Sequence, residues 1–167
     1  ADRGLAALTR DKVGVGMIFL PHDAAIAEVI HQTFEQIVQD EGLKVLGWRS
    51  VPVTPEVLGP LAKQYQPLIE QLIVESAQDT GDDLERSLYL VRRQMLHAME
   101  ALLADQERFS RDQIQKLREF YVCSFSSRTI VYKGMVRSAV LASFYEDLRN
   151  PAYVSSFAVY HRRFSTN

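Results

Sequence analysis

Short apolar runs mark four stretches of the chain. Residues 13–20 contain only apolar side chains and glycine, a pattern typical of a buried strand. Residues 43–51 and 120–125 are also rich in apolar side chains and predict two further strands. Residues 68–74 fit either a strand or a helix. The run is short and Pro67 precedes it, so we favour a strand there.

Two longer segments carry apolar side chains at helical spacing. Between residues 26 and 37 these side chains recur every three or four positions, which predicts an amphipathic helix. Asp23 is placed to cap its start, and Gly42 is placed to end it. The stripe between residues 84 and 102 has the same spacing and predicts a longer helix with one face in the core. An acidic turn at residues 79–83 leads into that helix.

The later part of the chain mixes helical and strand patterns. A short helix is predicted at residues 113–119 and another at residues 138–148. Residues 129–133 are expected to pair with the strand at 120–125 as a β-hairpin. A last strand is expected to begin at residues 155–160. The fold class is therefore α/β or α+β, with at least five strands.

Length and composition limit the possible classes of protein. The chain has 167 residues, which suits one domain with a buried core. It has 19 basic and 21 acidic residues, so its formal net charge is −2, which argues against a nucleic-acid-binding module and against intrinsic disorder. No apolar run approaches the ~18 residues of a membrane span. We expect a globular domain without nucleic-acid or membrane partners.

The sequence contains few candidates for catalytic or metal-binding residues. The single cysteine, Cys123, excludes an intrachain disulfide and an iron–sulfur cluster held by this chain alone. It is predicted to lie between Tyr121 and Phe125 on one face of a strand, where a thiol usually acts as a small hydrophobe. A nucleophilic role for Cys123 is the alternative. The four histidines show no metal-ligand spacing: His22, His31, His97 and His161.

The glycine pair at the start of the first strand invites comparison with a dinucleotide-binding loop. That fingerprint needs a third glycine three residues after Gly16, but Phe19 stands there, and no helix opens at the glycines. We expect Gly14 and Gly16 to allow a close approach of neighbouring groups to the strand instead.

The C-terminal segment has the clearest candidate for ligand binding. The predicted last strand becomes cationic and polar where it ends, at residues 161–167. An arginine guanidinium pairs bidentately with a carboxylate, so arginine beside short hydroxyl and amide side chains suits a small anionic ligand. A solvated chain end with surface arginines explains the same residues equally well.

Three segments resemble glutamate synthases, in their glutamine amidotransferase domain. Residues 161–167 read HRRFSTN, residues 45–52 read VLGWRSVP, and residues 120–135 run from FYVCS to IVYKGM. The order and spacing of these segments also fit, so the resemblance covers about residues 13–167. The sequences of residues 128–135 and 158–163 are more similar to the ferredoxin-dependent branch of the family than to the pyridine-nucleotide-dependent branch.

The resemblance implies a fold and a reaction. The fold would be a four-layer αββα N-terminal-nucleophile hydrolase, incomplete at both ends. In that family, an N-terminal cysteine attacks the side-chain amide of L-glutamine, with its own α-amino group as the base. The ammonia released converts 2-oxoglutarate to glutamate at a second site. FMN, an iron–sulfur cluster and the electron donor ferredoxin belong to other domains, so no cofactor is expected in this chain. The cytoplasm, or the plastid stroma in a photosynthetic eukaryote, is the expected location.

The chain departs from the family pattern at the nucleophile. Ala1 stands at its start, and Cys123 lies far inside it, so Cys123 has no free α-amine and no catalytic residue is assigned. Residues 1–167 are expected to form a partial amidotransferase domain that lacks the nucleophile and oxyanion-hole segments and is inactive in isolation. By resemblance, Arg163 binds the glutamine α-carboxylate and Thr166 lies in the same pocket. The alternative is a free-standing, non-catalytic carboxylate-binding or regulatory module of the same fold.

Overall fold

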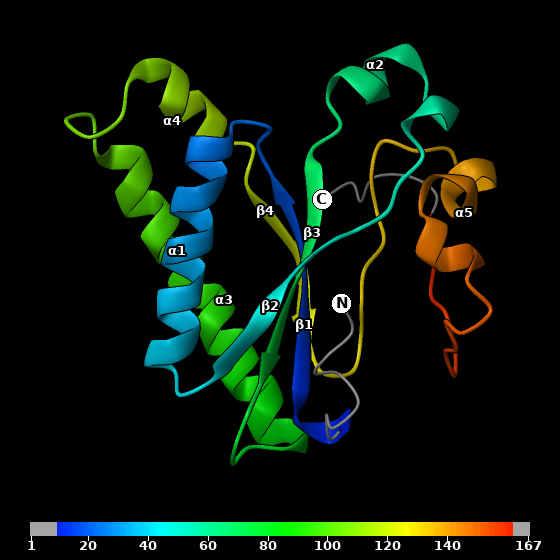
Figure 1. Ribbon diagram of the computed structural model, residues 1–167, viewed down its shortest axis with the longest axis horizontal. Helices are drawn as coiled ribbons and strands as arrows, with labels where there is room; N and C mark the ends of the chain where they lie inside the picture. The colour runs from blue at the N-terminus through cyan, green and yellow to red at the C-terminus, as the bar shows by residue number, and fades with distance from the viewer. Residues whose placement is uncertain (1–9, 162–167) are drawn as a thin grey trace. The chain divides into compact units, whose positions relative to one another are not determined.

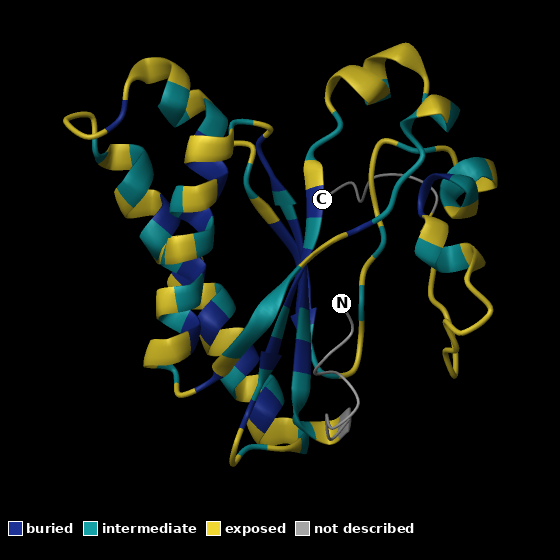
Figure 2. Cartoon of the chain, viewed as in Figure 1, coloured by how far each residue is buried: buried dark blue, intermediate teal, exposed yellow. Residues whose placement is uncertain are grey.

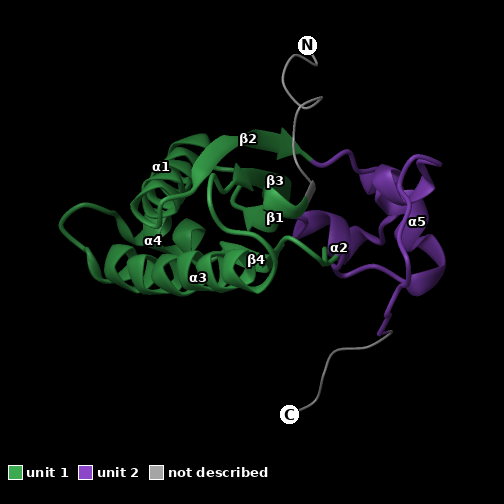
Figure 3. Cartoon of the chain, turned by 90° about the horizontal axis from the view of Figure 1, so that it is seen from below, with its two compact units in different colours: residues 1–50, 67–131 green, residues 51–66, 132–167 purple. Residues whose placement is uncertain are grey.

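A computed structural model describes residues 10–161 of the chain, and Arg163 and Thr166 lie outside these residues. The chain divides into two compact units (Figure 3). Unit 1 comprises residues 1–50 and 67–131, and unit 2 comprises residues 51–66 and 132–167. Each unit is described separately below.

Unit 1 is built on one antiparallel sheet (Figure 1). Its strands are β1 (Val13–Leu20), β2 (Lys44–Ser50), β3 (Leu68–Glu75) and β4 (Tyr121–Ser126), in the spatial order β2-β3-β1-β4. All four strands lie where the apolar runs predict them. Residues 68–74, whose sequence fits either a strand or a helix, form a strand, because β3 pairs with both β1 and β2.

Three helices cover one face of this sheet: α1 (Ala24–Asp40), α3 (Gly81–Ala104) and α4 (Arg111–Leu117) (Figure 1). The predicted cap of α1 is confirmed, because the Asp23 carboxylate accepts the Ile26 amide at 3.0 Å. Gly42 follows the end of α1 with φ of +79°, a left-handed conformation that favours glycine. The mixed α/β class predicted from the sequence is confirmed for these elements.

The core lies between the helices and the covered face of the sheet, where the buried residues concentrate (Figure 2). Both strand glycines face this core. A Cβ on Gly14 would lie 2.6 Å from Leu88 of α3, and one on Gly16 would lie 2.9 Å from the Phe125 ring. The two glycines thus allow α3 and β4 to approach β1 closely, as predicted, and they lie within the strand instead of a ligand-binding loop.

A β-bulge in β4 corrects the predicted face of Cys123. The register between β1 and β4 shifts within the strand, and Cys123 is the extra residue. Tyr121 pairs with Phe19, which lies on the face of the sheet away from the helices, whereas Phe125 pairs with Gly16 on the core face. Tyr121 and Phe125 therefore lie on opposite faces, because the bulge reverses the alternation of side chains.

Two predicted strands are absent from the described part of the chain. Residues 129–133 form no strand, because the Val131 amide donates to the side-chain Oγ of Ser124 at 3.1 Å instead of to a backbone ladder. Residues 154–161 have no regular structure either. Within residues 10–161 the sheet has four strands, and the expectation of at least five is wrong there.

Unit 2 consists of short helical turns around one tyrosine. It contains α2 (Pro60–Gln64) and α5 (Leu141–Phe144). The helix predicted over residues 138–148 is interrupted at Tyr145, which has an extended conformation and forms a β-bridge with Val53. Tyr145 is fully buried, and its hydroxyl donates to the Lys133 carbonyl at 2.7 Å. This anchoring explains why the predicted helix breaks into shorter turns.

Candidate functional site

The two residues predicted to bind substrate, Arg163 and Thr166, follow the described part of the chain. The segment before them is described, and its apolar side chains face solvent. Val154 is 83% exposed, Phe157 73%, Val159 88% and Tyr160 76%. Exposed apolar side chains that lie close together along a segment are typical of an interaction surface.

The only thiol of the chain is buried. Cys123 is 8% exposed and lies in the bulge of β4, between core residues Val122 and Phe125 on either side. A nucleophile must be reached by its substrate, and catalytic cysteines lie in partly exposed, electropositive surroundings. The position of Cys123 supports its interpretation as a small hydrophobe.

The helix histidines have structural partners. His31 Nε2 of α1 lies 2.8 Å from the Glu70 carboxylate of β3, and the His31 ring packs on Trp48 of β2 with centroids 4.2 Å apart. The Trp48 indole donates to Glu35 at 2.7 Å. These contacts tie α1 to the two neighbouring strands. Because they join residues far apart in the sequence, no local spacing could predict them.

His97 is exposed on α3 and lies 3.3 Å from Glu100 one turn away. No group of three or more His, Cys, Asp and Glu side chains among residues 10–161 is arranged to hold a metal ion. Within the same described range, no helix combines the length and the apolar character needed to cross a membrane.

The loop after β4 is anchored to α3 by a carboxylate. Glu85 accepts hydrogen bonds from the Ser126 hydroxyl at 3.0 Å and from the amide and hydroxyl of Ser127 at 2.6 Å. Arg128 adds an ion pair to Asp82 at 2.6 Å. Burial alone raises the pKa of Glu85, but the hydrogen bonds from Ser127 and Ser126 and the charge of Arg128 outweigh burial and hold the pKa below its ordinary value. This anchor replaces the predicted hairpin.

The sequence pattern did not predict a role for two arginines near α4. Arg111 and Arg118 line one cavity beside α4. Their separation of seven residues places them on the same face of a helix and is the signal that was available. Arginines at that spacing usually form part of a solvated helix face, so the pattern alone does not indicate a site.

Comparison with known proteins identifies the family. The chain matches the family "Glutamine amidotransferases class-II" over residues 1–167. It is 51% identical over 159 residues to ferredoxin-dependent glutamate synthase 2 of Synechocystis sp., which covers 94% of this chain and 9% of that protein. It is 47% identical over 167 residues to the chloroplastic ferredoxin-dependent glutamate synthase of Oryza sativa subsp. japonica, covering 99% of this chain and 10% of the relative.

A third relative gives the same result. The ferredoxin-dependent glutamate synthase 1 of Arabidopsis thaliana, named chloroplastic/mitochondrial, is 44% identical over 167 residues, again 99% of this chain and 10% of that protein. The chain thus spans about a tenth of the length of these relatives. The similarity to glutamate synthases suggested by the sequence motifs is confirmed, and the alternative of a free-standing regulatory module gains no support. The chain belongs to the class-II glutamine amidotransferases.

Proposed function

We propose that the chain is part of the glutaminase domain of a ferredoxin-dependent glutamate synthase. The observation that carries the proposal is the 51% identity to such an enzyme over 94% of the chain. The whole enzyme would make two molecules of L-glutamate from L-glutamine and 2-oxoglutarate, with reduced ferredoxin as the electron donor.

The domain is a partial one in this proposal, and its fold is the four-layer αββα arrangement of N-terminal-nucleophile hydrolases. Support comes from the face of the sheet that α1 and α3 do not cover. By alternation from Gly14 and Gly16, this face of β1 carries Val15, Met17 and Phe19. A sheet with apolar side chains on both faces needs a packed layer on each side.

The exposed C-terminal segment fits the same arrangement. Residues 155–160 have a strand-like sequence but no strand partner among the described residues, and Phe157 and Val159 are exposed. In the complete domain, we place this segment in the second sheet, where it would bring Arg163 and Thr166 to the substrate pocket.

Arg163 and Thr166 have binding roles in this proposal. The Arg163 guanidinium pairs with the α-carboxylate of glutamine, and Thr166 contributes to the same pocket. The nucleophile is a cysteine in a segment that precedes this chain in the family. Its thiolate attacks the side-chain amide carbon, ammonia leaves, and water hydrolyses the resulting thioester to glutamate and the free thiol. None of the residues described here enters the covalent step.

The residues of this chain do not fit the redox groups that the family carries. An iron–sulfur cluster needs several thiolates, and the sequence contains one cysteine, which is buried. The Gly14–Gly16 pair lies inside β1 and opens no phosphate-binding loop. FMN, the cluster and the ferredoxin contact therefore fall to other domains in this proposal. The chloroplastic names of two relatives favour the plastid stroma for a eukaryotic source and the cytoplasm for a bacterial one.

The test is an assay of the protein as its gene encodes it. Purified protein supplied with L-glutamine, 2-oxoglutarate and reduced ferredoxin should form two glutamates for each glutamine consumed. Protein that neither hydrolyses glutamine nor forms glutamate, although it is folded and carries its cofactors, would refute the proposal.

A further inference from the structure

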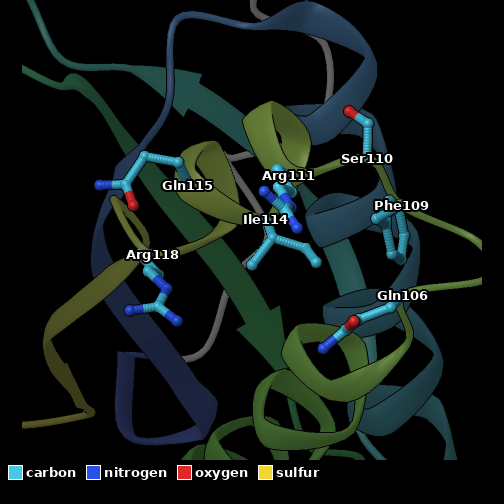
Figure 4. A pocket seen from close by; sticks show the side chains of 7 residues that line it. All are labelled: Gln106, Phe109, Ser110, Arg111, Ile114, Gln115 and Arg118. Carbon is cyan, nitrogen blue, oxygen red and sulfur yellow. The ribbon is translucent and has the colours of Figure 1, made fainter.

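A cavity of about 650 Å³ lies where the loop after α3 meets α4 (Figure 4). Pockets of roughly 300–1,000 Å³ are the usual size for small-molecule sites. The lining includes two arginines, two glutamines and two apolar side chains: Arg111, Arg118, Gln106, Gln115, Phe109 and Ile114. No acidic side chain is among the described residues that line it. The cavity is therefore rich in hydrogen-bond donors and positively charged.

The two arginines stand at opposite ends of one helix face. Arg111 is the first residue of α4, and Arg118 follows its last residue with helical dihedral angles. Seven helical residues make two turns, so their Cα atoms are separated by roughly 10 Å along the axis. Ile114 lies between them on the same face because it follows Arg111 by three residues. The face presents a cation, an apolar side chain and a second cation in order.

Neither of these arginines is neutralised by a described residue of unit 1. Among residues 10–161, the side chains of Arg111 and Arg118 make no ion pair or hydrogen bond. Neighbouring cations do have partners, since Lys116 pairs with Glu119 at 3.4 Å and the Arg108 guanidinium lies 4.9 Å from the centre of the Phe109 ring. A cation in the first turn of a helix also gains nothing from the helix dipole. The stability of α4 therefore does not explain Arg111.

We propose that this cavity binds a small organic dianion with an acidic group at each end and an apolar middle, such as an α,ω-dicarboxylate. One guanidinium pairs with each acidic group, since its planar fork matches a carboxylate. Ile114 contacts the carbon chain between them, and the glutamine amides can donate further hydrogen bonds. This site is separate from the glutamine-binding role proposed for Arg163, and its test does not depend on that role.

The experiment is isothermal titration calorimetry of the protein as its gene encodes it, with glutarate, pimelate, butyrate and inorganic phosphate as probes. Low ionic strength is needed because salt screens exposed ion pairs. A dicarboxylate should bind at least tenfold more tightly than butyrate. Arg111→Gln and Arg118→Gln should each weaken dicarboxylate binding roughly tenfold, as expected for one lost charge-assisted contact.

Arg93→Gln is the matched control, because Arg93 is also exposed, lies on α3 and does not line the cavity. It should leave the affinity unchanged. Arg111→Lys should give an intermediate loss, since it retains the charge but not the fork. Circular dichroism confirms that each variant is folded.

Three results would overturn the proposal. They are no binding of either dicarboxylate, an equal loss in Arg93→Gln, or phosphate and butyrate binding as tightly as the dicarboxylates. The last result would indicate a general attraction for anions without a two-ended site.

Discussion

The helix-covered side of the sheet and the segment at residues 154–161 are both rich in apolar side chains, but only the first buries them. Leu88 on α3 is fully buried, whereas Phe157 is 73% exposed. The strands of the sheet pair with one another within unit 1, whereas residues 154–161 belong to no strand of the described part of the chain. The first region is thus stabilised by burial and strand pairing within unit 1, whereas the second exposes its apolar side chains.

This difference leads us to expect that the two regions contribute to different properties of the molecule, one to its stability and the other to substrate binding. The region that folds around its own core contains the buried thiol and the structural histidine. The exposed segment at residues 154–161 precedes Arg163 and Thr166, the residues proposed to bind glutamine. Variants in the first region should therefore change stability, and variants at the end of the second should change substrate binding.

The largest effect is expected for Leu88→Ala. Removing a fully buried leucine side chain loses its transfer free energy and leaves a cavity, so the free energy of unfolding should fall by about 2–5 kcal/mol. Phe157→Ala removes a larger but exposed side chain. It should change the free energy of unfolding of the 167-residue chain by less than about 0.5 kcal/mol. Urea unfolding followed by circular dichroism measures both.

Phe157→Ala also tests the placement of residues 155–160 in a second sheet. In the full-length enzyme, Phe157→Ala should become costly, with a loss approaching the ~3–5 kcal/mol typical of a buried phenylalanine. If Phe157→Ala remains neutral there, the segment is a solvated surface strand or loop and the contrast between the two regions disappears.

Arg163→Lys should weaken glutamine binding without destabilising the fold. Lysine retains the positive charge but loses the planar fork, and one charge-assisted contact is worth about 1.5–3 kcal/mol. With 2-oxoglutarate fixed, the glutamine KM of the full-length enzyme should rise roughly tenfold or more. Activity driven by added ammonia should barely change because ammonia bypasses this pocket. An unchanged glutamine KM would mean that Arg163 does not bind the glutamine α-carboxylate.

Local patterns predicted most of unit 1, and long-range contacts decided the rest. The apolar stripe of α3 and the Asp23 cap of α1 lie in short windows of sequence, so periodicity and capping preferences identify them. The hairpin at 129–133 failed because the backbone after β4 binds side chains, with Val131 donating to Ser124. The Ser127 amide donates to Glu85, which lies 42 positions earlier, and a partner at that separation leaves no signal in the local sequence.

The sequence also predicted only some of the candidate site residues. Arg163 and Thr166 were predicted from the resemblance of residues 161–167 to a family motif. The physical pattern of these residues alone favoured a site for an anionic ligand and a solvated chain end equally. The cavity beside α4 went unrecognised, because it depends on how the loop after α3 folds against the helix and on which cations lack partners. Neither property is visible from the spacing of Arg111 and Arg118 alone.

Glu85→Gln should have a moderate effect on stability, because it weakens the anchor that holds the loop after β4. We expect a loss of about 1 kcal/mol for a partly exposed carboxylate that accepts several hydrogen bonds. The folded-state pKa of Glu85 lies below its ordinary value of 4.5, so its contribution is present above that pH and is lost as the pH falls through the folded-state pKa.

The stability difference between the unsubstituted protein and Glu85→Gln should therefore be constant near neutral pH and shrink in acid. Glu107→Gln, at an exposed glutamate, serves as the control and should show no such pH dependence. A difference that stays constant down to about pH 2 would mean that the charge of Glu85 contributes nothing to the anchor.

The smallest effect is expected for Cys123→Ala, measured on glutamine hydrolysis by the full-length enzyme. Cys123 is buried in the bulge of β4, and its small side chain should cost about 1 kcal/mol of stability when truncated. The kcat for glutamine should not change, because the proposed nucleophile needs a free α-amino group that an internal cysteine lacks. Circular dichroism and the KM for glutamine establish that the variant folds and binds substrate. A folded variant that binds glutamine but no longer hydrolyses it would make Cys123 the nucleophile and move the chemistry into the region that folds around its own core.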